Sequence, residues 1–63
     1  MTLTVKQARQ LKGWTQKRVA AELGVHRQTF SKWESNPDEM PVGKAKQFSK
    51  LVDRSVDEIF FIA

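Results

Sequence analysis

The segment that most constrains this chain is residues 16–34, where two helical patterns are separated by only a few residues around a glycine. Two helices joined by a three- or four-residue turn cross at a steep angle, about 90–120°. A close crossing needs a small side chain where the backbones meet, and Ala20 supplies it. The turn needs a positive φ at one position, which Gly24 adopts without steric cost. The segment therefore predicts one helix at about 16–23 and a second at about 27–35.

The apolar residues of this segment fall where such a crossing would bury them. On the first helix they are Val19 and Leu23, beside Ala20. On the second helix Phe30 and Trp33 are three residues apart, and positions three apart share a helix face. Val25 is placed to close the corner between the helices. Each feature alone is common, and their joint register is specific for a tight helical corner.

The rest of the chain also has helical patterns, and no stretch reads as a strand. Residues 4–7 and 55–58 have the spacing of capping boxes, Thr-x-x-Gln and Ser-x-x-Glu. The first box predicts a helix that ends at Gly13, where a left-handed stop is available, with an inner face of Val5, Ala8 and Leu11. The second box predicts a short last helix that buries Ile59 and Phe60.

A further helix is expected after the loop 36–41, which two prolines interrupt. Pro41 suits the first turn of that helix, and its inner positions follow at helical spacing: Ala45, Phe48 and Leu51. The patterns together predict an all-α class, a compact five-helix bundle in a single domain over residues 1–63. A domain of this size buries only about 60% of its unfolded surface, so the core is small.

Charge is distributed unevenly along the sequence. The chain has a net charge of +4, and residues 1–35 carry seven Lys or Arg against two Glu. Residues 36–63 carry four Lys or Arg against five acidic residues. This asymmetry points to a polyanionic partner for the first half. On charge alone, an ordinary solvated surface with a surplus of Lys explains it equally well.

Several classes of function are disfavoured by what the sequence lacks. Cysteine is absent and His26 is the single histidine, so we expect neither a disulfide nor a metal site. No nucleophile–base constellation, carboxylate pair or phosphate-cradling glycine loop is present, so we expect no enzyme activity, no cofactor and no small-molecule ligand. The longest apolar run, residues 59–63, is too short to span a bilayer, and the sequence shows no charged and apolar leader before a small-residue cleavage site. We therefore expect a cytoplasmic protein without a membrane partner.

The register of segment 16–34 resembles the helix-turn-helix of the Cro/C1 (Xre) family, which includes the phage repressors. The family motif is a Gln at the start, Ala four residues on, Gly eight on, and apolar residues fourteen and seventeen on: here Gln16, Ala20, Gly24, Phe30 and Trp33. The match extends to Arg9, Glu34 and residues 55–60. The resemblance implies a lambda-repressor-like domain that binds operator DNA, usually as a dimer, in a bacterial or phage-infected cell.

Helix geometry indicates which residues would read the DNA bases. With Phe30 and Trp33 inward, the outer face of the second helix is polar, and the start of a recognition helix normally meets the base edges. Arg27 can donate two hydrogen bonds to guanine O6 and N7, and Gln28 can bond adenine N6 and N7. Both match the principal base-reading positions of the family. The further expected base contacts are Lys32, Thr29 and Ser31.

Phosphate contacts are expected at the start of the first helix of the motif. Thr15 and Gln16 stand there, where free amides and the helix dipole favour an anion, and Gln16 is the family's phosphate-clamping position. The cations expected to contribute are Lys17, Lys12 and Lys44. Relatives carry Lys or Arg in the loop after the recognition helix. This chain carries Asp38 and Glu39 there instead, and Lys44 and Lys46 are the available substitutes.

Two further expectations concern structure and assembly. The family pattern pairs positions 9 and 34, so Arg9 and Glu34 are expected to form a partly buried ion pair between the first helix and the end of the recognition helix. Phe61 and Ile62 are apolar and follow the last helix, and exposed apolar residues are unusual unless a partner covers them. We predict that they contribute to a homodimer. The alternative is that Phe61 folds back into the core.

Three functions are compatible with these features. The first is a self-contained, sequence-specific transcriptional regulator, such as a phage or prophage repressor or a Cro-like protein. The second is the DNA-binding controller subunit of a toxin–antitoxin or restriction system. The third is a helical protein-interaction module without DNA binding. The residues Gln16, Arg27 and Gln28, together with the skewed charge, favour a partner of double-stranded DNA over the third function.

Overall fold

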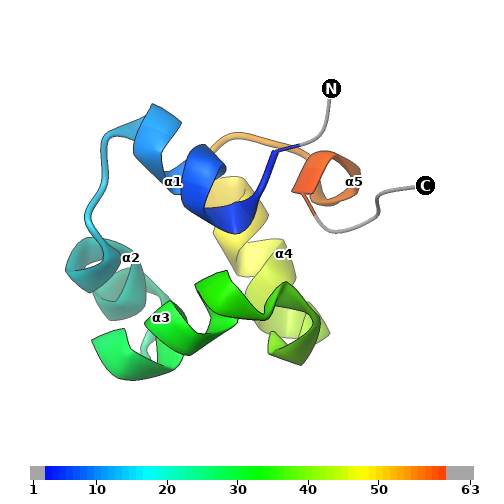
Figure 1. The fold of residues 1–63 in the computed structure, drawn as a ribbon. Coiled ribbons are helices and arrows are strands. Elements are labelled where there is room, and N and C mark those ends of the chain that lie inside the picture. The colour runs from blue at the N-terminus through cyan, green and yellow to red at the C-terminus, as the bar shows by residue number, and fades with distance from the viewer. Residues whose placement is uncertain (1–2, 60–63) are drawn as a thin grey trace.

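The computed structural model describes residues 3–59, and all regular structure within that range is helical (Figure 1). The elements are α1 (Val5–Lys12), α2 (Gln16–Leu23), α3 (Arg27–Ser35), the 3₁₀ helix η1 (Pro37–Glu39), α4 (Val42–Leu51) and α5 (Val56–Ile59). The predicted all-α fold class with five α-helices is confirmed. None of these helices is long and apolar enough to cross a membrane.

Local interactions set the ends of the first two helices. At the start of α1, the Gln7 amide N–H donates to Thr4 Oγ1 and the Thr4 amide N–H donates to Gln7 Oε1, both at 3.0 Å, which completes the capping box. Both α1 and α2 end at a glycine with left-handed backbone: Gly13 has φ of 81° and Gly24 has φ of 73°. Each glycine N–H donates to carbonyls of the preceding turn, as in common helix C-caps.

The core lies where α2, α3 and α4 meet. Phe30 of α3 and Phe48 of α4 are fully buried at its centre, with ring centroids 5.8 Å apart in a tilted arrangement. Ala20 is buried where α2 packs against α3, as the predicted close crossing requires. The core residues come from all five α-helices and from the cap positions Met40 and Val52: Val5, Ala8, Val19, Ala20, Leu23, Phe30, Trp33, Met40, Ala45, Phe48, Val52 and Ile59.

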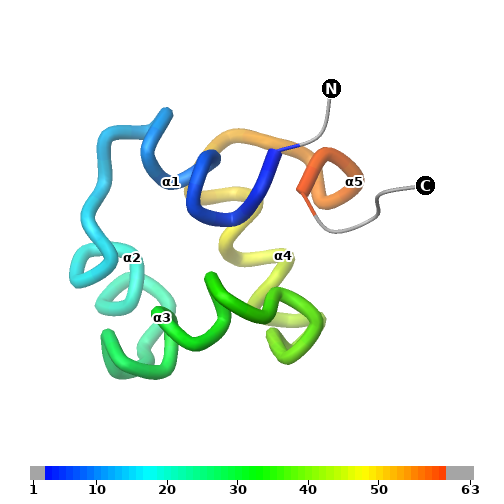
Figure 2. The backbone as a smooth tube through the Cα atoms, in the orientation of Figure 1, coloured from blue at the N-terminus to red at the C-terminus, as the bar shows by residue number. Residues whose placement is uncertain are grey.

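The first described residues, just before α1, lie beside α5 (Figure 2). The Leu3 amide N–H donates to the Glu58 carbonyl oxygen at 2.9 Å, and Leu3 packs against the core. Ile59 is buried, as expected for α5. The expected burial of Phe60 concerns a residue outside the described range.

Leu11 departs from the expected inner face of α1, because its side chain is 65% exposed. At about 100° per residue, Leu11 lies about 120° around the helix from Val5. Arg9 instead shares the inner side with Val5 and Ala8, since its side chain is only 11% exposed. The expectation that Leu11 lies in the core was therefore wrong. The largely buried side chain of Arg9 lies on the inner side of α1 instead.

The start and end of α4 also differ from the expectation. Pro41 caps α4 rather than occupying its first turn, and η1 fills part of the expected loop. At the other end Leu51 is half-buried, while Val52 is 4% exposed and takes the core position. Residues 45, 48 and 52 follow the helical spacing of three and four, so a one-residue shift in the pattern explains the change.

Candidate nucleic-acid interface

The outer face of α3 carries the polar residues that the sequence predicted to read bases. Phe30 and Trp33 anchor the inner face in the core. Arg27 and Gln28 lie in the first turn and Lys32 one turn later, all three exposed. Within residues 3–59, the side chains of these three residues form no hydrogen bond or ion pair. The first turn of α3 thus presents hydrogen-bonding groups that have no partner among residues 3–59.

Thr29 and Ser31 are less accessible to a base than the other residues of this face, because both are half-buried. The Ser31 carbonyl oxygen accepts a long hydrogen bond of 3.5 Å from the Ser35 hydroxyl, so the backbone there is engaged within the helix. Thr29 lines a shallow hollow together with four other residues: Gln28, Lys32, Trp33 and Glu39. Glu39 comes from η1, so the face around α3 is not formed by α3 alone.

The start of α3 has no side-chain cap. His26 occupies the N-cap position with extended backbone, and its side chain accepts no hydrogen bond from the first turn. His26 is exposed, so its imidazole is accessible beside Arg27. An uncapped helix start leaves backbone N–H groups to water or to a ligand.

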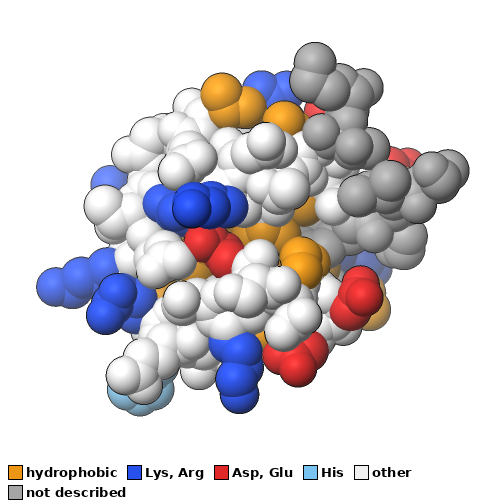
Figure 3. Space-filling view, viewed as in Figure 1, with side chains coloured by type: hydrophobic (Ala, Val, Ile, Leu, Met, Phe, Trp, Pro, Cys, Tyr) orange, Lys and Arg blue, Asp and Glu red, His pale blue; other side chains and the backbone are white. Residues whose placement is uncertain are grey.

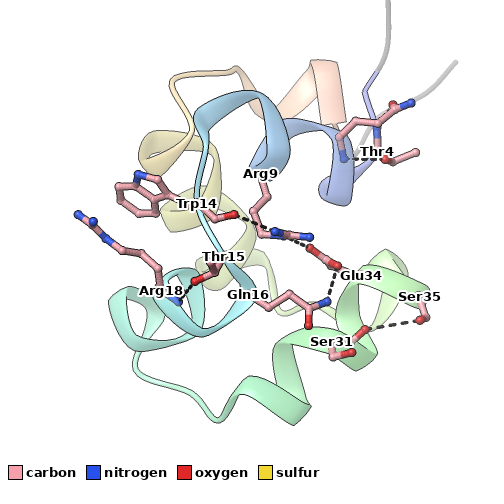
Figure 4. Close-up of polar contacts among 10 residues, drawn as sticks. Thr4, Arg9, Trp14, Thr15, Gln16, Arg18, Ser31, Glu34 and Ser35 are labelled. Atoms are coloured by element: carbon pink, nitrogen blue, oxygen red, sulfur yellow. Dashed lines mark hydrogen bonds and ion pairs between the residues drawn. The ribbon is translucent and has the colours of Figure 1, made fainter.

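The start of α2 is capped and restrained. Thr15 Oγ1 accepts a hydrogen bond of 3.1 Å from the Arg18 amide N–H. The Arg18 guanidinium lies 4.4 Å from the centroid of the Trp14 ring, in a cation–π arrangement that the sequence reading missed (Figure 4). Lys17 is exposed and, in the described part of the chain, unpaired. A fixed helix end with a free cation is suited to holding a phosphate.

Arg9 of α1 and Glu34 of α3, which the family pattern pairs, form a largely buried ion pair (Figure 4). Arg9 Nε donates to Glu34 Oε2 at 2.5 Å, and Arg9 Nη1 donates to the Trp14 carbonyl oxygen at 2.8 Å. The side chains of Arg9 and Glu34 are 11% and 6% exposed. Gln16 joins this network, because its Nε2 donates to Glu34 Oε1 at 2.7 Å. The network ties α1, the start of α2 and the end of α3 together.

Two of the cations expected at phosphates have partners inside the protein. Lys44 Nζ donates to the Leu23 carbonyl oxygen at 2.6 Å, at the C-terminal end of α2. A cation is favourable there because the last carbonyls of a helix are unpaired and carry partial negative charge. Lys12 Nζ lies 2.6 Å from Asp53 Oδ2. The Lys12 hydrogen bond, and then its charge, lower the pKa of the Asp53 carboxyl below its ordinary value.

Acidic side chains adjoin the outer face of α3 that carries Arg27, Gln28 and Lys32, the proposed reading face. In Figure 3 they gather at the lower right, where Figure 1 places η1. Asp38 and Glu39 supply the charges of this short element, and both are exposed. Among residues 3–59, no group of His, Asp and Glu side chains is arranged to hold a metal ion. Phe61 and Ile62, predicted at a dimer interface, lie outside the described residues.

Comparison with known protein families agrees with this geometry. A family model described as helix-turn-helix matches residues 5–59, which include all of α1 to α5. Among curated proteins and among solved structures, no significant match was found. The matched range covers most of the chain. The protein therefore belongs to the Cro/C1-type helix-turn-helix family and is a DNA-binding domain.

Proposed function

We propose that this protein is a sequence-specific transcriptional regulator, of the repressor or Cro-like kind, that reads an operator in the major groove through α3. One observation carries the proposal. The first turn of α3 presents Arg27 and Gln28, exposed and without partners among residues 3–59, on a helix whose opposite face is held in the core. A rigid helix with free bidentate side chains is what direct readout of guanine and adenine requires.

The start of α2 supplies the contacts that position the domain on DNA. Gln16 uses one N–H of its amide on Glu34, and the same amide nitrogen carries a second N–H for a phosphate oxygen. Lys17 adds a free charge beside it. Lys12 and Lys44 contribute less, because each must first leave its partner, Asp53 or the Leu23 carbonyl. Thr15 Oγ1 accepts the capping hydrogen bond from the Arg18 amide, and its O–H can still donate to a phosphate oxygen.

Selection of bound sites from random double-stranded DNA tests the proposal. We expect a recurring short site, and binding that weakens steeply as salt increases, because phosphate contacts release counterions. The selected site should contain a guanine and an adenine whose enrichment disappears with Arg27→Ala and Gln28→Ala, respectively. Recovery of random sequence after several rounds would contradict the proposal.

We propose further that the protein acts as a homodimer in which Phe61 and Ile62 contribute. A single recognition helix reads few base pairs, and two of them bind half-sites about 34 Å apart. Sedimentation of the wild type and Phe61→Asp, with and without a two-half-site operator, tests this assembly. We expect the variant to associate less and to bind the operator more weakly. Equal association and equal affinity would contradict the role of the tail.

A further inference from the structure

The 3₁₀ helix η1 brings a carboxylate to the edge of the proposed reading face. Glu39 lines the same hollow as Gln28, Thr29 and Lys32 of α3. Its neighbour Asp38 lines a different hollow, with residues of α4 and α5. Two adjacent acidic residues of one turn therefore face different sides of the molecule. Glu39 alone of the two stands beside the side chains proposed to meet DNA.

The position of Glu39 is fixed by short-range structure on both sides. The Asn36 amide N–H donates to the Lys32 carbonyl oxygen at 2.9 Å, so η1 continues directly from the last turn of α3. The Glu39 amide N–H donates to the Asn36 carbonyl oxygen at 3.0 Å. The next residue, Met40, is 6% exposed and anchors the end of η1 in the core. Glu39 is thus held on a rigid element, as a specificity residue must be.

The chemistry of a carboxylate restricts what it can meet in a major groove. An ionised Glu only accepts hydrogen bonds. The donors in the groove are the amino groups of cytosine and adenine, whereas guanine N7 and O6, thymine O4 and the phosphates are all acceptors. Within residues 3–59, Glu39 forms no ion pair or side-chain hydrogen bond that would occupy its oxygens. The acceptor groups of the DNA, including the phosphates, therefore repel this carboxylate. A base amino group, in contrast, can donate a hydrogen bond to it.

We infer that Glu39 is a specificity-determining residue that selects a base with an exocyclic amino group, cytosine above all, next to the bases read by α3. The inference rests on the proposed function, because it requires α3 to lie in the major groove. Lys32, in the same hollow, keeps the region attractive to DNA. Glu39 then weakens binding wherever its carboxylate faces an acceptor group of the DNA. It therefore increases the preference for the selected site and lowers the affinity for unrelated sequences.

Site selection with three variants tests the inference. Glu39→Gln removes the charge and gives a side chain that can both donate and accept, so it tolerates any base. Asp38→Asn removes a charge of the same sign from the adjacent residue, which lies outside the hollow, and is the matched control. Glu39→Asp keeps the charge but shortens the side chain. Glu39 is exposed, so all three proteins should fold, and thermal unfolding checks this.

For the wild type we expect a preference of about tenfold for cytosine at one position beside the α3 contacts. Glu39→Gln should lose that preference alone and bind random DNA several-fold more tightly. Glu39→Asp should lose the preference without the gain in random binding, and Asp38→Asn should keep it. If Glu39→Gln selects the wild-type site unchanged, the inference is overturned while the proposed function stands. If the wild type selects no site, the proposed function itself fails.

Discussion

The two helices of the motif begin in opposite ways. Each follows a short connection after a left-handed glycine, Gly13 or Gly24. The start of α2 is capped by the Thr15 hydroxyl and bound to Glu34 through Gln16. The start of α3 has no side-chain cap, and its first two side chains are exposed and unpaired within residues 3–59. One helix start is restrained by contacts within the protein, and the other has no such contact among residues 3–59.

This difference separates two tasks on one small scaffold. Contacts that set the register of the domain on a DNA backbone gain from a fixed helix end, since no ordering is then required on binding. Contacts that distinguish bases need side chains whose hydrogen-bonding groups are free to exchange water for a base edge. In the proposed function, the start of α2 that Arg9, Glu34 and Gln16 hold in place has the first task, and the first turn of α3 has the second.

The largest expected effect comes from breaking the restrained region. Glu34→Ala leaves the buried Arg9 charge without its partner and should lower the free energy of unfolding by about 3–5 kcal/mol. Denaturant unfolding measures it. Arg54→Ala, which removes an exposed pair at 3.8 Å, is the control and should cost less than about 1 kcal/mol. The double variant Arg9→Met, Glu34→Leu should cost less than the sum of its two single variants, and strict additivity would contradict a coupled pair.

A smaller effect on stability is expected from removing the N-cap of α2 and from adding one to α3. Thr15→Ala removes the cap of α2 and should cost about 1 kcal/mol of stability. His26→Ser offers a cap where α3 has none and should stabilise the protein by about 0.5–1 kcal/mol. Thermal unfolding of both variants at one pH measures the two changes. A loss of stability in His26→Ser would show that the first-turn N–H groups of α3 are not available for a side-chain cap.

The smallest expected effect concerns the pH dependence of the exposed pair of Lys12 and Asp53. Because Lys12 lowers the pKa of Asp53 in the folded state, the pair stabilises the protein above the ordinary carboxyl pKa. That contribution is lost as pH falls from about 4 through the lowered value. Asp53→Asn should therefore differ from the wild type at neutral pH and converge with it in acid. Asn tolerates the left-handed backbone of this position, where φ is 57°. A constant difference across pH would refute the assignment.

Much of the fold was predictable because its signals are local. Capping residues, left-handed glycines and helical spacing lie within a few residues of one another, so the sequence indicated the helices and most of the core. The exposure of Leu11 follows from helical spacing, which places it about 120° from Val5, and the expected inner face overlooked this. The buried side chain of Arg9 lies on the inner side of α1 instead.

The partners of Lys12 and Lys44 were missed because their signals are not local. Each contact joins residues far apart in the sequence. Lys12 binds the Asp53 carboxylate and Lys44 donates to a carbonyl at the end of α2, although both were expected at phosphates. The affinity of a carbonyl-rich helix end for a cation was the available signal for Lys44. The position of Glu39 beside α3 likewise depends on the 3₁₀ turn of η1, which composition alone does not indicate.

The most direct measurement compares one residue from each region on the same DNA. Lys17 belongs to the restrained start of α2 and, unlike Gln16, has no partner in the described chain, so its removal leaves the network intact. Lys17→Ala should weaken binding to selected and random DNA by similar factors and reduce the salt slope by about 1. Arg27→Ala should weaken the selected site by about 1–3 kcal/mol and lower its ratio to random DNA. An unchanged ratio for Arg27→Ala would contradict the assignment of the open helix start as the reading end.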